Sequence, residues 1–350
     1  MTVVLERFPL GPQWPTIDPF LFVAHHDDAY PVGDGQLRPA VPLTGRTIGS
    51  DFSGRDGWSM YHGSGVPGFP QHPHRGFETV TYVRQGLVDH SDSMGATARY
   101  GRGDTQWMTA GRGIQHAEMF PLVDDAGPNP LELFQIWVNL PAADKMVEPY
   151  FTMFWDHHTP RVVHKDDDGR AAEVTVIAGR LGDAEPPAPP PNSWAARAES
   201  DLAIWHVKLE AGATFTLPEP AGGTPDNPTL RMLYVFEGEG LDLAAGPATD
   251  RLSGGEGGLL APGTAVELRA LDRGNGTGTE ALLMQGRPIG EPVARYGPFV
   301  MNTEAEINQA FADYRDTEFG GWPWADPAPD HGSDPTRFAL HADGHRETAD

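Results

Sequence analysis

Short runs of β-branched and aromatic residues recur along this chain, and turn residues separate them. Runs of this kind, about four to eight residues long, are typical of β-strands. They occupy residues 77–83, 131–140, 173–178, 202–209 and 231–236. The chain also has 42 glycines and 34 prolines, which are unfavourable inside helices and belong at turns. The pattern predicts an all-β fold with many short strands.

The length of 350 residues favours two domains, because single hydrophobic cores stop growing at about 250 to 300 residues. The apolar run at 131–140 gives way to a polar segment between Pro141 and Pro149, and we place the domain boundary there. We therefore expect one domain over residues 1–145 and a second over residues 146–300.

One helix is predicted near the end of the chain. Thr303 precedes Glu306 at the spacing of a capping box, which marks the start of a helix. Apolar residues then recur on one helical face, at Ile307, Ala310, Phe311 and Tyr314. We expect this helix within residues 301–324. Residues 325–350 are acidic and almost without apolar pattern, so we expect a tail that is disordered or lies over the surface.

The charge of the chain limits its partners. It carries 25 basic and 49 acidic side chains, a formal net charge of -24, which would repel a phosphate backbone. We expect no direct binding of nucleic acid. The sequence has no apolar run of about 20 residues and no signal-peptide pattern at its start, so we expect a cytoplasmic protein without a membrane span. The oligomeric state is left open.

Histidine pairs supply the candidate site. His72 and His74 lie two residues apart, directly before a predicted strand, and His116 and Glu118 are also two residues apart. Residues i and i+2 of a strand point to the same face, so each pair would project two potential ligands to one side of a sheet. Because the chain has no cysteine, any metal must be held by nitrogen and oxygen.

The spacing alone leaves two interpretations of these histidine pairs open: surface or hydrogen-bonded pairs, or metal ligands. An isolated His-x-His pair is more often a surface or hydrogen-bonded pair than a metal site. The metal interpretation requires the two pairs to meet across a barrel. Imidazoles and one carboxylate would then suit iron, nickel, copper, manganese or zinc.

Three long segments carry a resemblance to a known family. The segment HPHRGFETVTYVRQGLVDHSDSMG, followed by YGRGDTQWMTAGRGIQHAEMF, resembles the paired metal-binding motifs of pirins, which are members of the cupin superfamily. The segment GRPIGEPVARYGPFVMNTEAEINQAFADYRDTEFG is similar to the pirin C-terminal ending. The likeness extends over about residues 18–320. It implies two cupin barrels (double-stranded β-helix, or jelly-roll) packed together, with a short C-terminal helix.

The resemblance also implies the ligand set. His72, His74, His116 and Glu118 would hold the metal in the barrel of residues 1–145, and family members commonly carry iron there. General cupins instead use a glutamate shortly after the His-x-His pair, which would be Glu78 here. We favour Glu118, with Glu78 as an acceptor that orients a ligating imidazole. No histidines stand at the corresponding positions of residues 146–300, so we expect no metal site in the second barrel.

The resemblance implies two functions of different classes. The first is an Fe(II)-dependent dioxygenase of the quercetin 2,3-dioxygenase type, acting on a flavonol-like or other enolisable aromatic small molecule. Glu118 would then serve as the base that accepts the substrate proton. The second is a regulator in which oxidation of Fe(II) to Fe(III) alters the affinity for a protein partner, and the negative charge would favour a basic surface on that partner.

Three other polar residues have simpler interpretations. Adjacent residues of an extended chain face opposite ways, so we expect His25 and His26 to be loop residues outside any site. Arg75 follows His74, and the sequence leaves open whether it recognises an anionic substrate group or forms a structural ion pair.

Overall fold

The computed structural model describes residues 2–272, 274 and 276–349, and it divides the chain into two compact units. One unit comprises Met1–Val23 and His157–Gly290, and the other comprises Ala24–Asp156 and Glu291–Asp350. Among the described residues no helix combines the length and the apolar character that crossing a membrane requires. The prediction of an all-β chain with one short helix near its C-terminus is confirmed.

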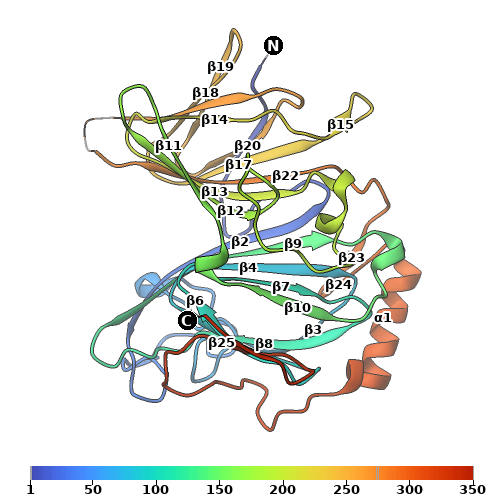
Figure 1. Ribbon diagram of the computed structural model, residues 1–350. Helices are drawn as coiled ribbons and strands as arrows, with labels where there is room; N and C mark the ends of the chain where they lie inside the picture. Colours follow the sequence, from blue (N-terminus) through green and yellow to red (C-terminus); the bar gives the residue numbers. More distant parts are fainter. Residues whose placement is uncertain (1, 273, 275, 350) are drawn as a thin grey trace. The chain divides into compact units, whose positions relative to one another are not determined.

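The unit that contains residues 157–290 consists of two antiparallel sheets and a small hairpin (Figure 1). The seven-stranded sheet has the order β1 (Val4–Pro9), β20 (Glu256–Leu260), β17 (Leu230–Glu237), β22 (Thr279–Gly286), β13 (Ala203–Leu209), β12 (Ala171–Ala178) and β11 (Arg161–Lys165). The four-stranded sheet has the order β14 (Thr214–Leu217), β21 (Val266–Ala270), β18 (Gly240–Ala245) and β19 (Ala248–Ser253). The hairpin pairs β15 (Gly223–Thr224) with β16 (Asn227–Pro228). One apolar core takes side chains from both sheets, so the sheets face each other.

The other unit is also built from two antiparallel sheets. The five-stranded sheet has the order β10 (Tyr150–Phe154), β7 (Thr105–Thr109), β4 (Phe77–Gln85), β9 (Pro128–Asn139) and β2 (Phe20–Val32), whose first residues belong to the other unit. The six-stranded sheet has the order β26 (Arg346–Thr348), β25 (Phe338–Leu340), β6 (Thr97–Gly101), β5 (Leu87–Asp92), β8 (Ile114–Met119) and β3 (Gly68–His74). A hairpin of β23 (Ala294–Tyr296) and β24 (Phe299–Met301) precedes helix α1 (Glu304–Thr317).

Six single-turn 3-10 helices complete the described elements. They are η1 (Arg55–Gly57), η2 (Ala142–Asp144), η3 (Asp156–His158), η4 (Trp194–Ala196), η5 (Ala198–Ser200) and η6 (Glu318–Gly320).

The units do not follow the expected limits of residues 1–145 and 146–300. Strand β1 pairs with β20, so the first residues of the chain join the unit of residues 157–290. Strand β10 pairs with β7, which extends the other unit beyond residue 145. The segment from Glu291 onward joins that unit as well. Pairings between strands so far apart in sequence leave no local signal, so composition alone could not indicate them.

Helix α1 begins as expected. The Thr303 hydroxyl accepts a hydrogen bond from the Glu306 backbone N–H at 3.2 Å, and the Glu306 carboxylate accepts one from the Thr303 N–H at 2.8 Å. Arg75 forms a structural ion pair with this helix: its Nη1 lies 2.6 Å from Oδ2 of Asp313, and its Nε donates to the Arg112 carbonyl at 2.6 Å. The structure therefore favours the second of the two roles left open for Arg75.

The turn between β3 and β4 requires glycine. Gly76 has φ +84°, and a Cβ at this position would lie 2.0 Å from the Val300 carbonyl oxygen. A side chain would be both strained and obstructed there. Gly76 lies two residues after His74, so this turn follows directly on the strand that carries the first histidine pair.

The C-terminal segment is ordered rather than a free tail. Strand β25 pairs with β6, with Ala339 opposite Ala98, and β26 folds back on β25 as a hairpin. Ala339 is fully buried. The short run Phe338–Leu340 forms a strand because it pairs with β6 on one side and with β26 on the other, and the sequence did not reveal β6 as its neighbour.

Candidate metal centre

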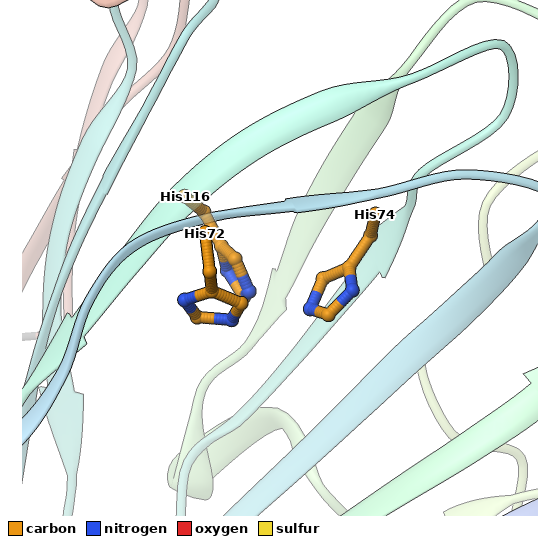
Figure 2. Close-up of side chains that lie close together, drawn as sticks. All are labelled: His72, His74 and His116. Carbon is orange, nitrogen blue, oxygen red and sulfur yellow. The ribbon is translucent and has the colours of Figure 1, made fainter. Parts of the chain in front are cut away.

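The six-stranded sheet brings the two predicted ligand pairs together. Strands β3 and β8 are antiparallel neighbours, and His72 lies directly opposite His116. Alternate residues of a strand share a face, so His74 and Glu118 lie on the same side as their partners two residues away. The pairing shifts register between Phe69 and His72, as at a β-bulge. Figure 2 shows the three imidazoles gathered beside these strands.

The three imidazoles are close enough to share one ion. One ring nitrogen from each of His72, His74 and His116 lies within 4.8 Å of the others. In the described part of the chain no other group of three histidine or acidic side chains lies this close. His74 and His116 are buried, and His72 is partly exposed. The predicted convergence of the histidines is therefore present in the fold.

The hydrogen bonding of these rings fits a metal. Nδ1 of His72 lies 2.8 Å from the Pro70 carbonyl oxygen, which can accept only from a protonated nitrogen. This bond fixes the tautomer and leaves Nε2 unprotonated for a ligand. Both ring nitrogens of His116 are buried and make no hydrogen bond to the described residues. A buried polar atom without a partner is costly, and a bound metal ion would satisfy it.

The electrostatics keep the three rings neutral. Burial lowers the pKa of His72 to about 4, and it also lowers the pKa of His74 and of His116 well below the usual value for histidine. The cause is desolvation, which disfavours the charged imidazolium, and the neighbouring histidines add to it. At neutral pH the imidazoles are therefore in the form that binds metal.

Glu118 lies beside the cluster, and its carboxylate is hydrogen-bonded. Its Oε2 is 3.8 Å from Nε2 of His116. Thr81 Oγ1 donates to Oε1 at 3.2 Å, and Gln135 Nε2 donates to Oε2 at 3.2 Å. Both donors come from the five-stranded sheet, on β4 and β9. Burial raises the pKa of the Glu118 carboxyl, while these hydrogen bonds oppose the rise.

Glu78 occupies a different environment. It is fully buried, and its Oε1 accepts a hydrogen bond from Thr109 Oγ1 at 2.7 Å. Thr81, three residues further along β4, reaches Glu118. Residues separated by an odd number on a strand point to opposite faces, so Glu78 points away from the face that carries Thr81. This alternation speaks against Glu78 as a ligand.

His90 and Asp92 form a further pair beside the cluster, which was not predicted from the sequence. These residues lie on β5, next to β8, where His90 is opposite Glu118 and Asp92 is opposite His116. Both are buried, and Nε2 of His90 lies 3.1 Å from Oδ2 of Asp92. The ring centroids of His90 and His116 are 5.6 Å apart. The two-residue spacing of His90 and Asp92 matches that of the two ligand pairs, and this signal was available in the sequence.

The donor set indicates which ions would fit. Three neutral nitrogens with one neighbouring carboxylate suit a borderline divalent ion of the first transition row. Three or four protein ligands leave coordination positions free on an ion that prefers six, which is the arrangement of a reactive rather than a closed structural site.

Comparison with known proteins identifies relatives along most of the chain. The family model described as Pirin matches residues 3–138, and the model described as Pirin C-terminal cupin domain matches residues 204–320. A Pseudomonas aeruginosa protein whose name provisionally assigns it as a quercetin 2,3-dioxygenase is 40% identical over 252 residues, which cover 72% of this chain and 79% of that protein. Pirin from Homo sapiens is 35% identical over 264 residues, which cover 74% of this chain and 80% of that protein.

A solved structure gives the same result for the fold. A quercetin 2,3-dioxygenase from Acinetobacter baumannii is 28% identical with a TM-score of 0.68, and the match covers 92% of this chain and 99% of that chain. The predicted pair of cupin domains is thus confirmed by the family models and by this structural match. These similarities, together with the histidine cluster, show that the chain belongs to the pirin family.

Proposed function

We propose that this protein is an iron-dependent dioxygenase of the quercetin 2,3-dioxygenase type, with the metal held by His72, His74, His116 and Glu118. The observation that carries the proposal is the convergence of three neutral, buried or half-buried imidazoles beside one carboxylate. Two relatives whose names refer to quercetin 2,3-dioxygenase activity support a flavonol-like substrate.

In the proposed reaction the metal ion and the side chains have different roles. When bound, the ion would lower the pKa of a coordinated substrate hydroxyl and supply redox chemistry toward dioxygen. The histidines hold their nitrogens in the neutral form, as their lowered pKa values require. Glu118 would accept the hydroxyl proton on a carboxylate oxygen that does not hold the metal, because its carboxylate lies beside the imidazole cluster. Thr81 and Gln135 keep that carboxylate in place.

Oxygen consumption tests the activity. Protein loaded with Fe(II) under anaerobic conditions is mixed with quercetin and air-saturated buffer, and we expect oxygen uptake together with loss of the flavonol absorbance. Protein without metal serves as the control. Absence of uptake with every flavonol tried would contradict the enzymatic proposal.

The formal net charge of -24 supports a second candidate, a redox-dependent regulator that binds a basic surface of a protein partner. Binding that changes when Fe(II) is oxidised to Fe(III), in a protein that consumes no oxygen with flavonols, would favour this candidate.

The two glutamates make a matched comparison. In Glu118→Gln the side chain keeps its size and loses its charge, and we expect the metal affinity to fall by at least about 10-fold, because removing even an outer partner of a metal site costs about 10- to 100-fold. Glu78→Gln should retain the metal, because Glu78 points to the other face of β4. Metal content after dialysis and competition with a chelator measure both variants. Loss of metal in the Glu78 variant alone would reverse our assignment.

A further inference from the structure

A group of aromatic rings lies beside the metal centre and reaches the surface. We call it the aromatic wall. Its members are His26, Phe52, Tyr61, His62, Phe69 and Phe120. Phe69 is central: its ring centroid lies 5.1 Å from Tyr61, 6.1 Å from Phe120 and 5.9 Å from His26. These separations and the mixture of stacked and edge-on orientations are favourable for aromatic contact.

One end of the aromatic wall contacts the candidate ligands. The ring centroid of Phe69 is 6.4 Å from that of His72, and Phe69 lies opposite Glu118 in the pairing of β3 with β8. Phe69 and His72 are both partly exposed. The aromatic wall therefore borders the side on which the imidazole cluster is accessible.

The other end is open to solvent. The Phe52 side chain is 56% exposed, although its ring lies 5.1 Å from His62 and 6.4 Å from Phe69. Phe52, His62 and the partly exposed Phe69 form one group of neighbouring rings at the surface, and contiguous exposed apolar groups, unlike scattered single ones, mark sites that bind another molecule. The core of the unit does not require Phe52 in this position, since the ring is mostly outside it.

The aromatic wall also contains a polar group that is fixed in orientation. Tyr61 Oη donates to Oδ2 of Asp28 at 2.7 Å, and the Ser59 backbone N–H donates to the other carboxylate oxygen at 2.9 Å. Nδ1 of His26 lies 2.8 Å from Tyr61 Oη. Because the Tyr61 proton goes to Asp28, His26 must donate from Nδ1, which leaves Nε2 as an acceptor. Burial lowers the pKa of His26 to about 4, so the ring is neutral at pH 7.

We propose that the aromatic wall is the substrate-binding subsite, where a planar polyhydroxylated aromatic molecule lies against Phe52 and Phe69 and donates a hydroxyl hydrogen bond to Nε2 of His26. Its metal-binding oxygens would then point toward His72. Apolar and aromatic surfaces with a few fixed polar groups are the usual lining of small-molecule sites. This inference rests on the proposed dioxygenase function. The structure corrects the expectation that His25 and His26 are loop residues, because both lie on strand β2.

Binding to the intact protein tests the subsite without turnover. The chain is loaded with Zn(II), which is redox-inert, and the Kd for quercetin is measured from the shift of the flavonol absorbance. Phe52→Ala should raise the Kd about 2- to 12-fold, the range equivalent to one aromatic contact. Phe69→Leu should raise it similarly. Tyr296 is a residue outside the aromatic wall that is 69% exposed, and Tyr296→Ala should leave the Kd unchanged.

A further variant tests the proposed hydrogen bond to Nε2 of His26 separately from the stacking of the substrate on aromatic rings. His26→Phe retains a ring and loses the acceptor, so it should weaken binding of quercetin more than binding of 3-hydroxyflavone, which has fewer hydroxyl groups. An unchanged ratio of the two Kd values would remove His26 from the subsite. Metal content and the thermal midpoint of each variant are measured alongside, so that a loss of metal or of folding is not mistaken for a loss of substrate binding.

The outcomes distinguish this inference from the proposed function. Oxygen uptake by the Fe(II) protein with unchanged Kd and KM in both phenylalanine variants would overturn the subsite and leave the dioxygenase in place. Flavonol binding that depends on Phe52 and Phe69, without oxygen uptake, would contradict the dioxygenase and retain the subsite. Failure of the Zn(II) protein to bind any flavonol would contradict both.

Discussion

Replacing His116 with glutamine should lower the affinity for Fe(II) or Zn(II) by more than about 100-fold, beyond the 10- to 100-fold loss caused by removing an outer partner of a metal site. His116 is fully buried, lies opposite His72, and has both ring nitrogens unpaired among the described residues. Glutamine occupies a similar volume but cannot replace an imidazole nitrogen. Metal content after dialysis and a chelator competition give the affinity.

A matched control is His164→Gln, which changes an exposed histidine of β11. It should bind metal as the unaltered protein does. Retention of full affinity in the His116 variant would contradict the site, because no other described cluster of this kind could take over the ion.

The two-residue spacing predicted correctly that both members of each ligand pair share a face. This prediction depends only on the alternation of side chains along a strand. The two residues of each pair, His72 with His74 and His116 with Glu118, point to the same face of their strand regardless of which strands pair with it. The meeting of the two pairs depends on β3 and β8 being neighbours, and spacing alone left that open. The resemblance to pirins supplied this step. The structure then shows that the Glu118 carboxylate is shared with Thr81 and Gln135.

Two other groups of residues that depend on distant strand pairing were not predicted. His90 and Asp92 matter only because β5 lies next to β8. The aromatic wall joins residues from β2, from the segment before β3, from β3 itself and from the position directly after β8, and no local pattern connects them. Neither group stands out in the sequence by its residue types. Each group has a role only because the pairing of the strands brings its side chains close to the candidate metal centre.

The segment that was expected to be a tail participates in the same sheet. The His331 backbone N–H donates to Oδ2 of Asp89 at 2.9 Å, and Nε2 of His331 lies 2.9 Å from the His90 carbonyl oxygen. Trp324 Nε1 donates to the Asp92 carbonyl at 2.9 Å. These contacts all reach β5, the strand next to the one that carries His116 and Glu118. Order in residues 324–340 is thus coupled to the strand that supports the candidate metal centre.

Arg99→Leu should lower the free energy of unfolding by about 3–5 kcal/mol, the cost of leaving one member of a buried ion pair without its partner. Arg99 Nε and Nη2 donate to the two carboxylate oxygens of Asp89, each at 2.6 Å, and both side chains are fully buried. Arg99 Nη1 also donates to the Asp334 carbonyl. The variant leaves a buried carboxylate and releases a contact of the C-terminal segment. Urea unfolding at pH 7, followed by tryptophan fluorescence, gives the change.

The loss in the free energy of unfolding should come from the unpaired Asp89 carboxylate and not from the smaller volume of leucine at position 99. The double variant Asp89→Leu/Arg99→Leu removes the charge as well, and it should be less destabilised than Arg99→Leu because apolar pairs often replace buried ion pairs at little cost. Arg112→Leu breaks a pair with Glu148 whose side chains are 57% and 71% exposed, and it should cost less than about 1 kcal/mol. If the double variant proved as unstable as Arg99→Leu, packing and not charge would be the cause, and the contact with Asp334 would become the more important one.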